Sequence, residues 1–232
     1  TAENVKIDHA KVVDRKDKVV KMLVSGVGAT MKAHKVNVVM AEGVIKGKTA
    51  DGFVVTANGE EYAADKLILP GVGSFNKSVE NLEKLELIEI IKMKVQSGTP
   101  LLGICLGMQM LFKKGYENGE SEGLGFIEGS VEVLEPKYKV KIPHIGWNRL
   151  ELNKESKITK GLDKNSFVYY VHSYGATNFK DTELIAYSNY GGIKIPSIVC
   201  SNNVYGTQFH PEKSGVVGLK ILKNFGEEIK WL

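Results

Sequence analysis

The stretch Pro100-Leu101-Leu102-Gly103-Ile104-Cys105-Leu106-Gly107 decides the fold expected for this chain. Its apolar half is typical of a buried strand, and the following residues 108–114 are compatible with a helix. Glycines on both sides of Cys105 permit a sharp strand-to-helix turn that lifts the cysteine side chain above a sheet. We therefore predict a nucleophile elbow, with a thiol at a helix N-terminus where unpaired N–H groups favour the thiolate.

A second motif, His210-Pro211-Glu212, supplies the groups that a nucleophilic thiol needs. His210 can serve as general base and acid, and Glu212 can hold its imidazole in one tautomer. In an extended chain, residues i and i+2 point to the same side, so Glu212 is expected behind His210. Taken singly, Cys105 could be a core cysteine and His-Pro-Glu a surface turn. Together they favour a Cys-His-Glu triad, while Cys200, which lacks an elbow, is expected in the core.

Composition bounds the class of protein. The chain has 232 residues, 43% of them hydrophobic, which is enough for one large α/β domain or two small ones. It has no run of 18 apolar residues and no apolar leader, so we expect a soluble, cytoplasmic protein. Two cysteines cannot form a disulfide framework, and no metal site is expected. The net charge of +4 comes from lysines interspersed with acids, which indicates a solvated surface and no nucleic-acid partner.

The periodicity predicts a helix–strand alternation around the elbow. Helices are expected at 11–34, 78–97 and 214–229, a strand at 36–40, and β-rich structure from about 122 to 210. Asn58-Gly59 between two β-type runs predicts a type I′ hairpin. The alternation predicts an α/β fold with a mostly parallel sheet and helices on both faces.

Two further segments carry polar groups with more than one interpretation. Pro70-Gly71-Val72-Gly73-Ser74 lies between a strand and a helix. It can be a plain turn or a phosphate loop, but it lacks the glycine and lysine spacing of nucleotide motifs. Beside an elbow it can instead direct backbone N–H groups at an oxyanion. The aromatic stretches 143–148 and 169–174 fit core packing, a substrate wall or a partner surface.

These motifs together resemble those of the class I glutamine amidotransferases, and among them the glutaminase subunits of imidazole glycerol phosphate synthases, which serve histidine biosynthesis. The resemblance runs from about residue 67 to the C-terminus. It is carried by residues 67–75, 103–109, 142–148, 171–174 and 206–214.

The resemblance implies a role for each matched residue. It implies a glutaminase that forms a thioester on Cys105 and uses His210 and Glu212, without a cofactor. The implied oxyanion donors are Gly71, Val72, Gly73 and Leu106, and the implied glutamine-binding residues are Gly73, Gln109 and Ser173. The implied contacts with a (β/α)₈-barrel cyclase partner, in a heterodimer, are Trp147, Asn148 and Lys213.

The first 66 residues depart from that family, which opens with an apolar strand and an Asp-Tyr-Gly-x-Gly-Asn turn. Residues 1–69 resemble instead an internal segment of dihydrolipoyl dehydrogenase, as in 14–20, 34–39 and 64–69. The chain is thus similar to a chimera, with an atypical N-terminal segment at 1–66 and an amidotransferase domain at 67–232. The reductase's redox cysteine pair and flavin fingerprint are absent from the sequence, so flavin binding is not expected.

Two alternatives to this interpretation stay open at the level of sequence. The chain could be another class I amidotransferase that delivers ammonia to a different acceptor. It could also be a folded but inactive chimera, or a module that docks the barrel without catalysis.

Overall fold

The computed structural model describes residues 9–33, 39, 44–49 and 52–229. The chain divides into two units, Thr1–Lys48 with Phe53–Tyr62 and Thr49–Gly52 with Ala63–Leu232. The strand predicted at 36–40 lies, except for residue 39, outside the described residues.

The N-terminal elements are one long helix and a small three-stranded sheet. Helix α1 spans His9–Ala33, close to the predicted 11–34. The strands lie in the order β1-β2-β3, with bounds β1 Val44–Thr49, β2 Gly52–Ala57 and β3 Glu60–Ala64. Asn58 and Gly59 join β2 to β3 with φ angles of 52° and 81°. These left-handed angles are those of a type I′ turn, so the predicted hairpin is confirmed.

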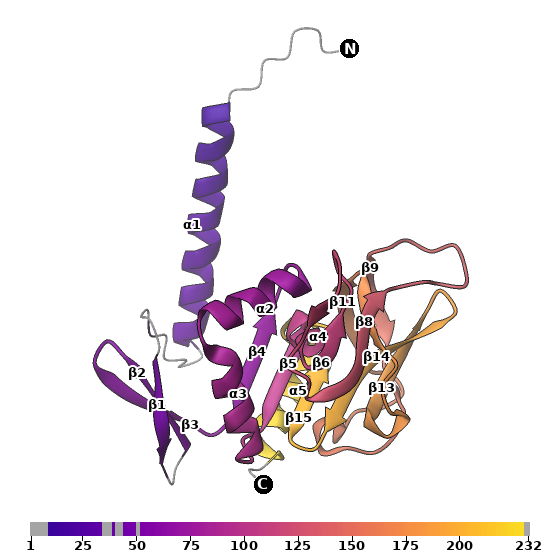
Figure 1. The fold of residues 1–232 in the computed structure, drawn as a ribbon. Helices are drawn as coiled ribbons and strands as arrows, with labels where there is room; N and C mark the ends of the chain where they lie inside the picture. Colours follow the sequence, from indigo (N-terminus) through magenta and orange to yellow (C-terminus); the bar gives the residue numbers. More distant parts are fainter. Residues whose placement is uncertain (1–8, 34–38, 40–43, 50–51, 230–232) are drawn as a thin grey trace, which may run out of the picture. The chain divides into compact units, whose positions relative to one another are not determined.

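A mixed sheet forms the centre of the second unit (Figure 1). In the described residues its order is β10-β13-β14-β15-β5-β4. Strands β15, β5 and β4 pair in parallel, whereas β10, β13, β14 and β15 pair antiparallel. The bounds are β4 Leu67–Gly71, β5 Leu101–Cys105, β10 Glu151–Leu152, β13 Leu184–Tyr190, β14 Ile193–Ser201 and β15 Val204–Thr207. The expected parallel sheet is therefore confined to the strands beside the elbow, because the later strands follow one another through short turns that allow antiparallel pairing.

Helices cover both faces of this sheet, as predicted. Leu101 of β5 packs in one apolar cluster with α2 (Phe75–Lys84), α3 (Leu87–Gln96) and α4 (Leu106–Met110). Leu102 packs in a second cluster with α5 (Gly215–Glu227). Successive strand residues thus face opposite cores, which explains why β5 is apolar at every position but glycine.

Two predicted helices are shorter than expected. The stretch 78–97 is divided into α2 and α3 at Glu86, whose φ is 56°. After the elbow, α4 ends at Met110, and Phe112–Gly115 form strand β6. Phe112 and Gly115 pair with strand β8 (Ile127–Val133), so tertiary pairing overrides the local helical pattern.

The remaining strands form two smaller sheets. A four-stranded sheet has the order β12-β8-β6-β7 within the described residues, with β7 at Ser121–Glu122 and β12 at Tyr174–Thr177. A two-stranded ribbon, here called the β9–β11 ribbon, pairs β9 (His144–Arg149) with β11 (Phe167–His172). Single 3₁₀ turns lie at η1 Lys157–Thr159, η2 Asp181–Glu183 and η3 Pro211–Lys213.

Candidate active site

Cys105 occupies a strained turn between β5 and α4. Its φ and ψ are 54° and −108°, a region that side-chain-bearing residues rarely adopt. Such a conformation costs about 1–3 kcal/mol and persists only where the surroundings enforce it. The predicted nucleophile elbow is therefore present in the backbone geometry.

The glycines of the elbow are required by close backbone approach. A Cβ on Gly107 would lie 1.7 Å from the carbonyl oxygen of Leu69 in β4. A Cβ on Gly103 would lie 2.6 Å from the carbonyl oxygen of Gly107. The start of α4 thus packs directly on the backbones of β4 and β5, and this contact fixes the position of Cys105.

A pocket of about 290 Å³ opens beside the elbow. Its lining brings together residues from five separate parts of the sequence, namely Val72, Gly73, Cys105, Leu106, Gln109, Glu117, Val171, His172, Ser173, Tyr174 and His210. Of the residues proposed from sequence to hold glutamine or its oxyanion, only Gly71 is missing from this lining. Gly71 pairs with Cys105 in the sheet, and a Cβ on it would lie 3.1 Å from Gly107 N.

His210 is held rigidly at the pocket. Its Nδ1 lies 2.8 Å from Glu212 Oε1, its backbone N–H donates to Tyr169 O at 3.0 Å, and its carbonyl accepts from Ser214 Oγ at 2.6 Å. His210 is buried and Glu212 is half-exposed. The expected pairing is present, but Glu212 reaches His210 through the 3₁₀ turn η3 and not through an extended chain. Proline at the first position of that turn explains the difference.

The electrostatics of Cys105 differ from the sequence expectation. Burial raises the pKa of its thiol to about 11; the Leu106 N–H and Lys213 lower it, and Glu212 raises it further. Desolvation of the thiolate therefore outweighs the donor at the start of α4, which is only five residues long. The expected thiolate is wrong for the resting structure, where Cys105 is a thiol at neutral pH.

The β9–β11 ribbon places two buried histidines behind the pocket. His144 and His172 are directly opposite in the register, and His144 Nδ1 lies 3.0 Å from His172 Nε2. His172 Nδ1 donates to Tyr174 O at 2.8 Å, and His144 Nε2 lies 2.8 Å from Asn148 Oδ1. Burial lowers the pKa of His172 to about 4 and the pKa of His144 below its usual value. The His172 ring is therefore neutral near pH 7.

Of the residues expected at a partner interface, Trp147 and Asn148 are neighbours in β9 and Lys213 lies in η3. Trp147 is 54% exposed and meets Tyr169 edge-on, with ring centroids 5.8 Å apart. The Tyr169 N–H donates to Ser214 Oγ at 3.0 Å, which places the ribbon beside η3 and its exposed Lys213. Asn148 is half-buried and donates to Asn189 O at 3.2 Å.

Sequence reasoning missed two residues that the structure brings to the site. Glu117 lines the pocket and accepts from the Phe75 N–H at 2.8 Å. Gln208 is fully buried with its Nε2 3.9 Å from Cys105 Sγ. Neither residue carries a local signal: Glu117 lies in a polar loop, and Gln208 stands between Thr207 and Phe209, two residues before His210.

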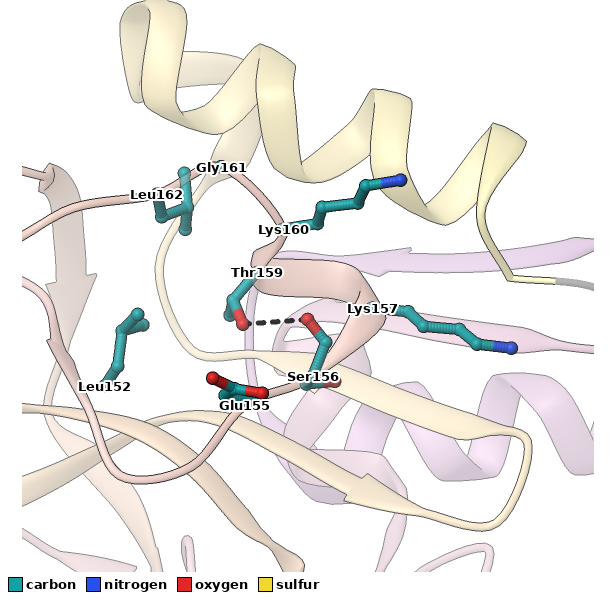
Figure 2. Close-up of a pocket in the computed structure, with 8 residues that line it drawn as sticks. All are labelled: Leu152, Glu155, Ser156, Lys157, Thr159, Lys160, Gly161 and Leu162. Carbon is teal, nitrogen blue, oxygen red and sulfur yellow. Dashed lines mark hydrogen bonds between the residues drawn. The ribbon is translucent and has the colours of Figure 1, made fainter.

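A larger hollow of about 530 Å³ lies away from these groups (Figure 2). No histidine or cysteine lines it. In Figure 2 the amines of Lys157 and Lys160 point away from Leu152 and Leu162, and Thr159 Oγ1 donates within the lining to Ser156 O at 3.0 Å. Its size alone does not make it the site of chemistry.

Within residues 9–33, 39, 44–49 and 52–229, no group of three or more His, Cys, Asp or Glu side chains is placed to hold a metal ion. No helix in that part of the chain is long and apolar enough to cross a membrane.

Comparisons with known proteins agree on one family. A model of the family Glutamine amidotransferase class-I matches residues 11–229. Imidazole glycerol phosphate synthase subunit HisH of Lactococcus lactis subsp. lactis is 58% identical over 72% of this chain and 81% of that protein. The HisH subunit of Aquifex aeolicus is 47% identical over 78% of this chain and 88% of that protein.

Solved structures share the fold. A crystal structure of a glutamine amidotransferase, 22% identical, has a TM-score of 0.53 and covers 70% of this chain and 79% of that one. The structure of PurLQS from Thermotoga maritima, 19% identical, has a TM-score of 0.54 over 71% of this chain and 80% of that one. The predicted α/β amidotransferase-like fold class is confirmed. The comparisons do not support the resemblance of residues 1–69 to dihydrolipoyl dehydrogenase, and the family model already begins at residue 11.

Proposed function

The chain belongs to the class-I glutamine amidotransferases, and on that premise we propose that it is the glutaminase subunit of an imidazole glycerol phosphate synthase in histidine biosynthesis. In this proposal it hydrolyses glutamine to glutamate and ammonia. The observation that carries the proposal is one pocket lined by the strained Cys105 and by His210, which is itself paired with Glu212.

The proposed reaction begins with activation of the thiol. Because burial raises the pKa of Cys105 to about 11, the nucleophile forms when its proton passes to the His210 imidazole, which Glu212 stabilises as a cation. The sulfur then attacks the side-chain amide carbon of glutamine. The resulting oxyanion is held by the Leu106 N–H and by the loop of Gly71, Val72 and Gly73, and one such donor is typically worth about 3 kcal/mol.

Two steps complete the proposed cycle. The tetrahedral intermediate collapses to a γ-glutamyl thioester as His210 returns its proton to the departing ammonia. His210 then takes a proton from water, whose oxygen attacks the thioester carbon. Collapse of the second intermediate releases glutamate and returns the thiol.

The same pocket suggests how glutamine is oriented. Gly73, Gln109 and Ser173 are the proposed binding residues, and all three line the pocket. We add Glu117, because a carboxylate in this lining is matched to the α-ammonium of an amino acid.

We propose that Trp147, Asn148 and Lys213 dock a (β/α)₈-barrel cyclase in a heterodimer, and that ammonia crosses this interface. An exposed tryptophan on the ribbon, with an exposed lysine on the turn that adjoins it, is the kind of aromatic anchor with a charged rim that interfaces use. The proposed location is the cytoplasm, where the synthase would act. The lyase step that consumes ammonia would then belong to the partner.

We also propose that residues 67–232 form the amidotransferase domain and that 1–66 are a separate N-terminal segment. The division of the chain near residue 62 supports this boundary, whereas the family model begins at residue 11 and runs across it.

The test is glutamate release from glutamine by the purified chain, with and without the barrel cyclase and its nucleotide ligand. Cyclase-stimulated release that Cys105→Ala abolishes, together with a thioester trapped on Cys105, is the expected result. Release that is unchanged by Cys105→Ala would contradict the mechanism. If the folded chain binds the cyclase but releases no glutamate, it is a docking module and not a glutaminase.

A further inference from the structure

Gln208 is a buried side chain that the proposed reaction does not yet use. It is 0% exposed and follows β15, and its backbone N–H donates to Ser197 O at 3.0 Å. Its side-chain amide lies between two groups of the site. Nε2 is 3.9 Å from Cys105 Sγ, and Oε1 is 3.1 Å from Gln109 Nε2.

The hydrogen bonds around Gln208 fix which end of its amide faces the sulfur. The Tyr174 carbonyl can only accept, and Gln109 Nε2 lies 2.9 Å from it, so the amide nitrogen of Gln109 must be at that position. The second hydrogen of the same nitrogen points to the Gln208 amide, which must therefore present its oxygen. The nitrogen of Gln208 is left to face Cys105. The Tyr174 carbonyl thus fixes the orientation of the Gln109 amide, and the Gln109 amide in turn fixes that of the Gln208 amide beside the sulfur.

We propose that Gln208 donates an N–H hydrogen bond to the Cys105 thiolate, and that Gln109, besides binding substrate, holds Gln208 in the donating orientation. The proposal rests on the glutaminase function above and deepens it. Gln208 and the Leu106 N–H would then form a pair of donors on the anionic sulfur. A bond to an ion is shorter and stronger than a bond to a neutral group, so the 3.9 Å contact with the thiol is expected to contract when the thiolate forms.

The groups around Cys105 explain why its thiolate requires a further hydrogen-bond donor such as Gln208. The other groups that act on the sulfur are the Leu106 N–H and Lys213, which favour the anion, and Glu212, which opposes it. His210 and Glu117 line the pocket, and Val171 O lies 4.0 Å from Sγ, where it suits a thiol and not a thiolate. When the proton of Cys105 passes to His210, Gln208 gains a strong bond and the Val171 contact is lost. Gln208 therefore lowers the free energy of the activated state relative to the resting one.

Alkylation of Cys105 by iodoacetamide tests the proposal, because at pH 8.5 its rate is proportional to the thiolate fraction. Gln208→Glu keeps the oxygen that Gln109 needs and removes the N–H, and Gln208→Met removes the donor without adding charge. The alkylation of each site is followed by mass spectrometry of the full chain. Cys200, whose Sγ bonds Asn202 O at 3.5 Å, is an internal reference thiol. Circular dichroism confirms that each variant is folded.

We expect both substitutions to slow alkylation of Cys105 about tenfold or more, which is the effect of losing one hydrogen bond to an ion, and to leave Cys200 unchanged. In the glutaminase assay of Gln208→Glu, which keeps the oxygen that positions Gln109, kcat falls while KM stays within about twofold, since the lost donor contacts the nucleophile and not the substrate. A slower rate in Gln208→Glu alone would show a charge effect and overturn the proposal, as would an unchanged rate in both folded variants. Alkylation needs no turnover, so a chain without glutaminase activity would still decide the role of Gln208.

Discussion

The elbow and the β9–β11 ribbon both supply residues to the pocket, but they are held in place by different kinds of contact. At the elbow, neighbouring residues of one short stretch meet the backbone of β4, and glycines make the contact possible. In the ribbon, side chains separated by more than 20 residues share buried hydrogen bonds, as His144 and His172 do. The comparison teaches that backbone shape fixes the nucleophile, whereas a buried polar network fixes the wall opposite it.

Gly107→Ala is expected to have the largest effect. The added Cβ would overlap the Leu69 carbonyl, and neither backbone can move without displacing β4 or Cys105, so we expect a loss of about 3 kcal/mol or more in the free energy of unfolding. Urea unfolding measures it. Gly226→Ala in α5 is the control, because its Cβ meets open space and alanine favours helix by about 0.5–1 kcal/mol. Equal stability of the two variants would show that the close backbone approach at Gly107 does not limit stability.

The buried histidine His172 of the ribbon should make the free energy of unfolding depend on pH. His172 is neutral in the fold because burial lowers its pKa to about 4, whereas in the unfolded chain it takes up a proton near the ordinary value of 6.5. Its contribution is therefore complete above pH 6.5 and is lost as the pH falls toward 4, about 3 kcal/mol in all.

The measurement is urea unfolding at several pH values for the natural chain and His172→Gln. Between pH 6.5 and 4 the free energy of unfolding should fall further for the chain with His172 than for His172→Gln. Parallel profiles for the two proteins would mean that His172 is not held neutral. An NMR titration of the His172 ring in the folded chain gives the same answer independently of the variant.

Tyr170→Phe tests the ribbon with a smaller change. The Tyr170 hydroxyl lies 2.8 Å from Ser188 Oγ and 2.5 Å from Ser197 Oγ. Both serines keep a carbonyl partner when the hydroxyl is removed, on Arg149 and Ile195 respectively. We therefore expect a loss of only about 1 kcal/mol in unfolding free energy. A loss as large as that of Gly107→Ala would mean that the polar network, and not the elbow, dominates stability.

Trp147→Ala should have the smallest effect on the isolated chain, about 0.5 kcal/mol, because the side chain is more than half exposed. In the proposed heterodimer the same change should weaken cyclase binding about 30-fold, as expected for an interface anchor. Titration calorimetry with the barrel measures the affinity. Met93→Ala on α3, with the same 54% exposure, is the matched control outside the ribbon and η3. Unchanged affinity for Trp147→Ala would show that the interface lies elsewhere.

The elbow could be predicted from sequence because its signal is local. Apolar strand, glycine, cysteine and glycine stand in one stretch, and the close approach that they permit has few alternatives. The antiparallel pairing of β13 and β14 could have been predicted, because the two-residue turn Gly191-Gly192 between them is a hairpin signal that was missed. The acidity of Cys105 could not, because burial by residues distant in sequence outweighs the donors next to it.

The roles of Glu117 and Gln208 also stayed hidden, because each depends on one long-range contact. Glu117 bonds to Phe75, which is 42 residues away in the sequence. Gln208 contacts Cys105, which is 103 residues away. The triad pairing of His210 with Glu212 was visible, since two residues of separation leave little freedom.

Because Cys105 has a positive φ, the residue that would best stabilise this position is not the one that activity requires. Glycine is the residue that best tolerates this backbone conformation, so an unbiased selection for thermostability would favour Cys105→Gly. That substitution would remove the nucleophile. Cys105 is therefore a strained position that a stabilised enzyme must leave unchanged.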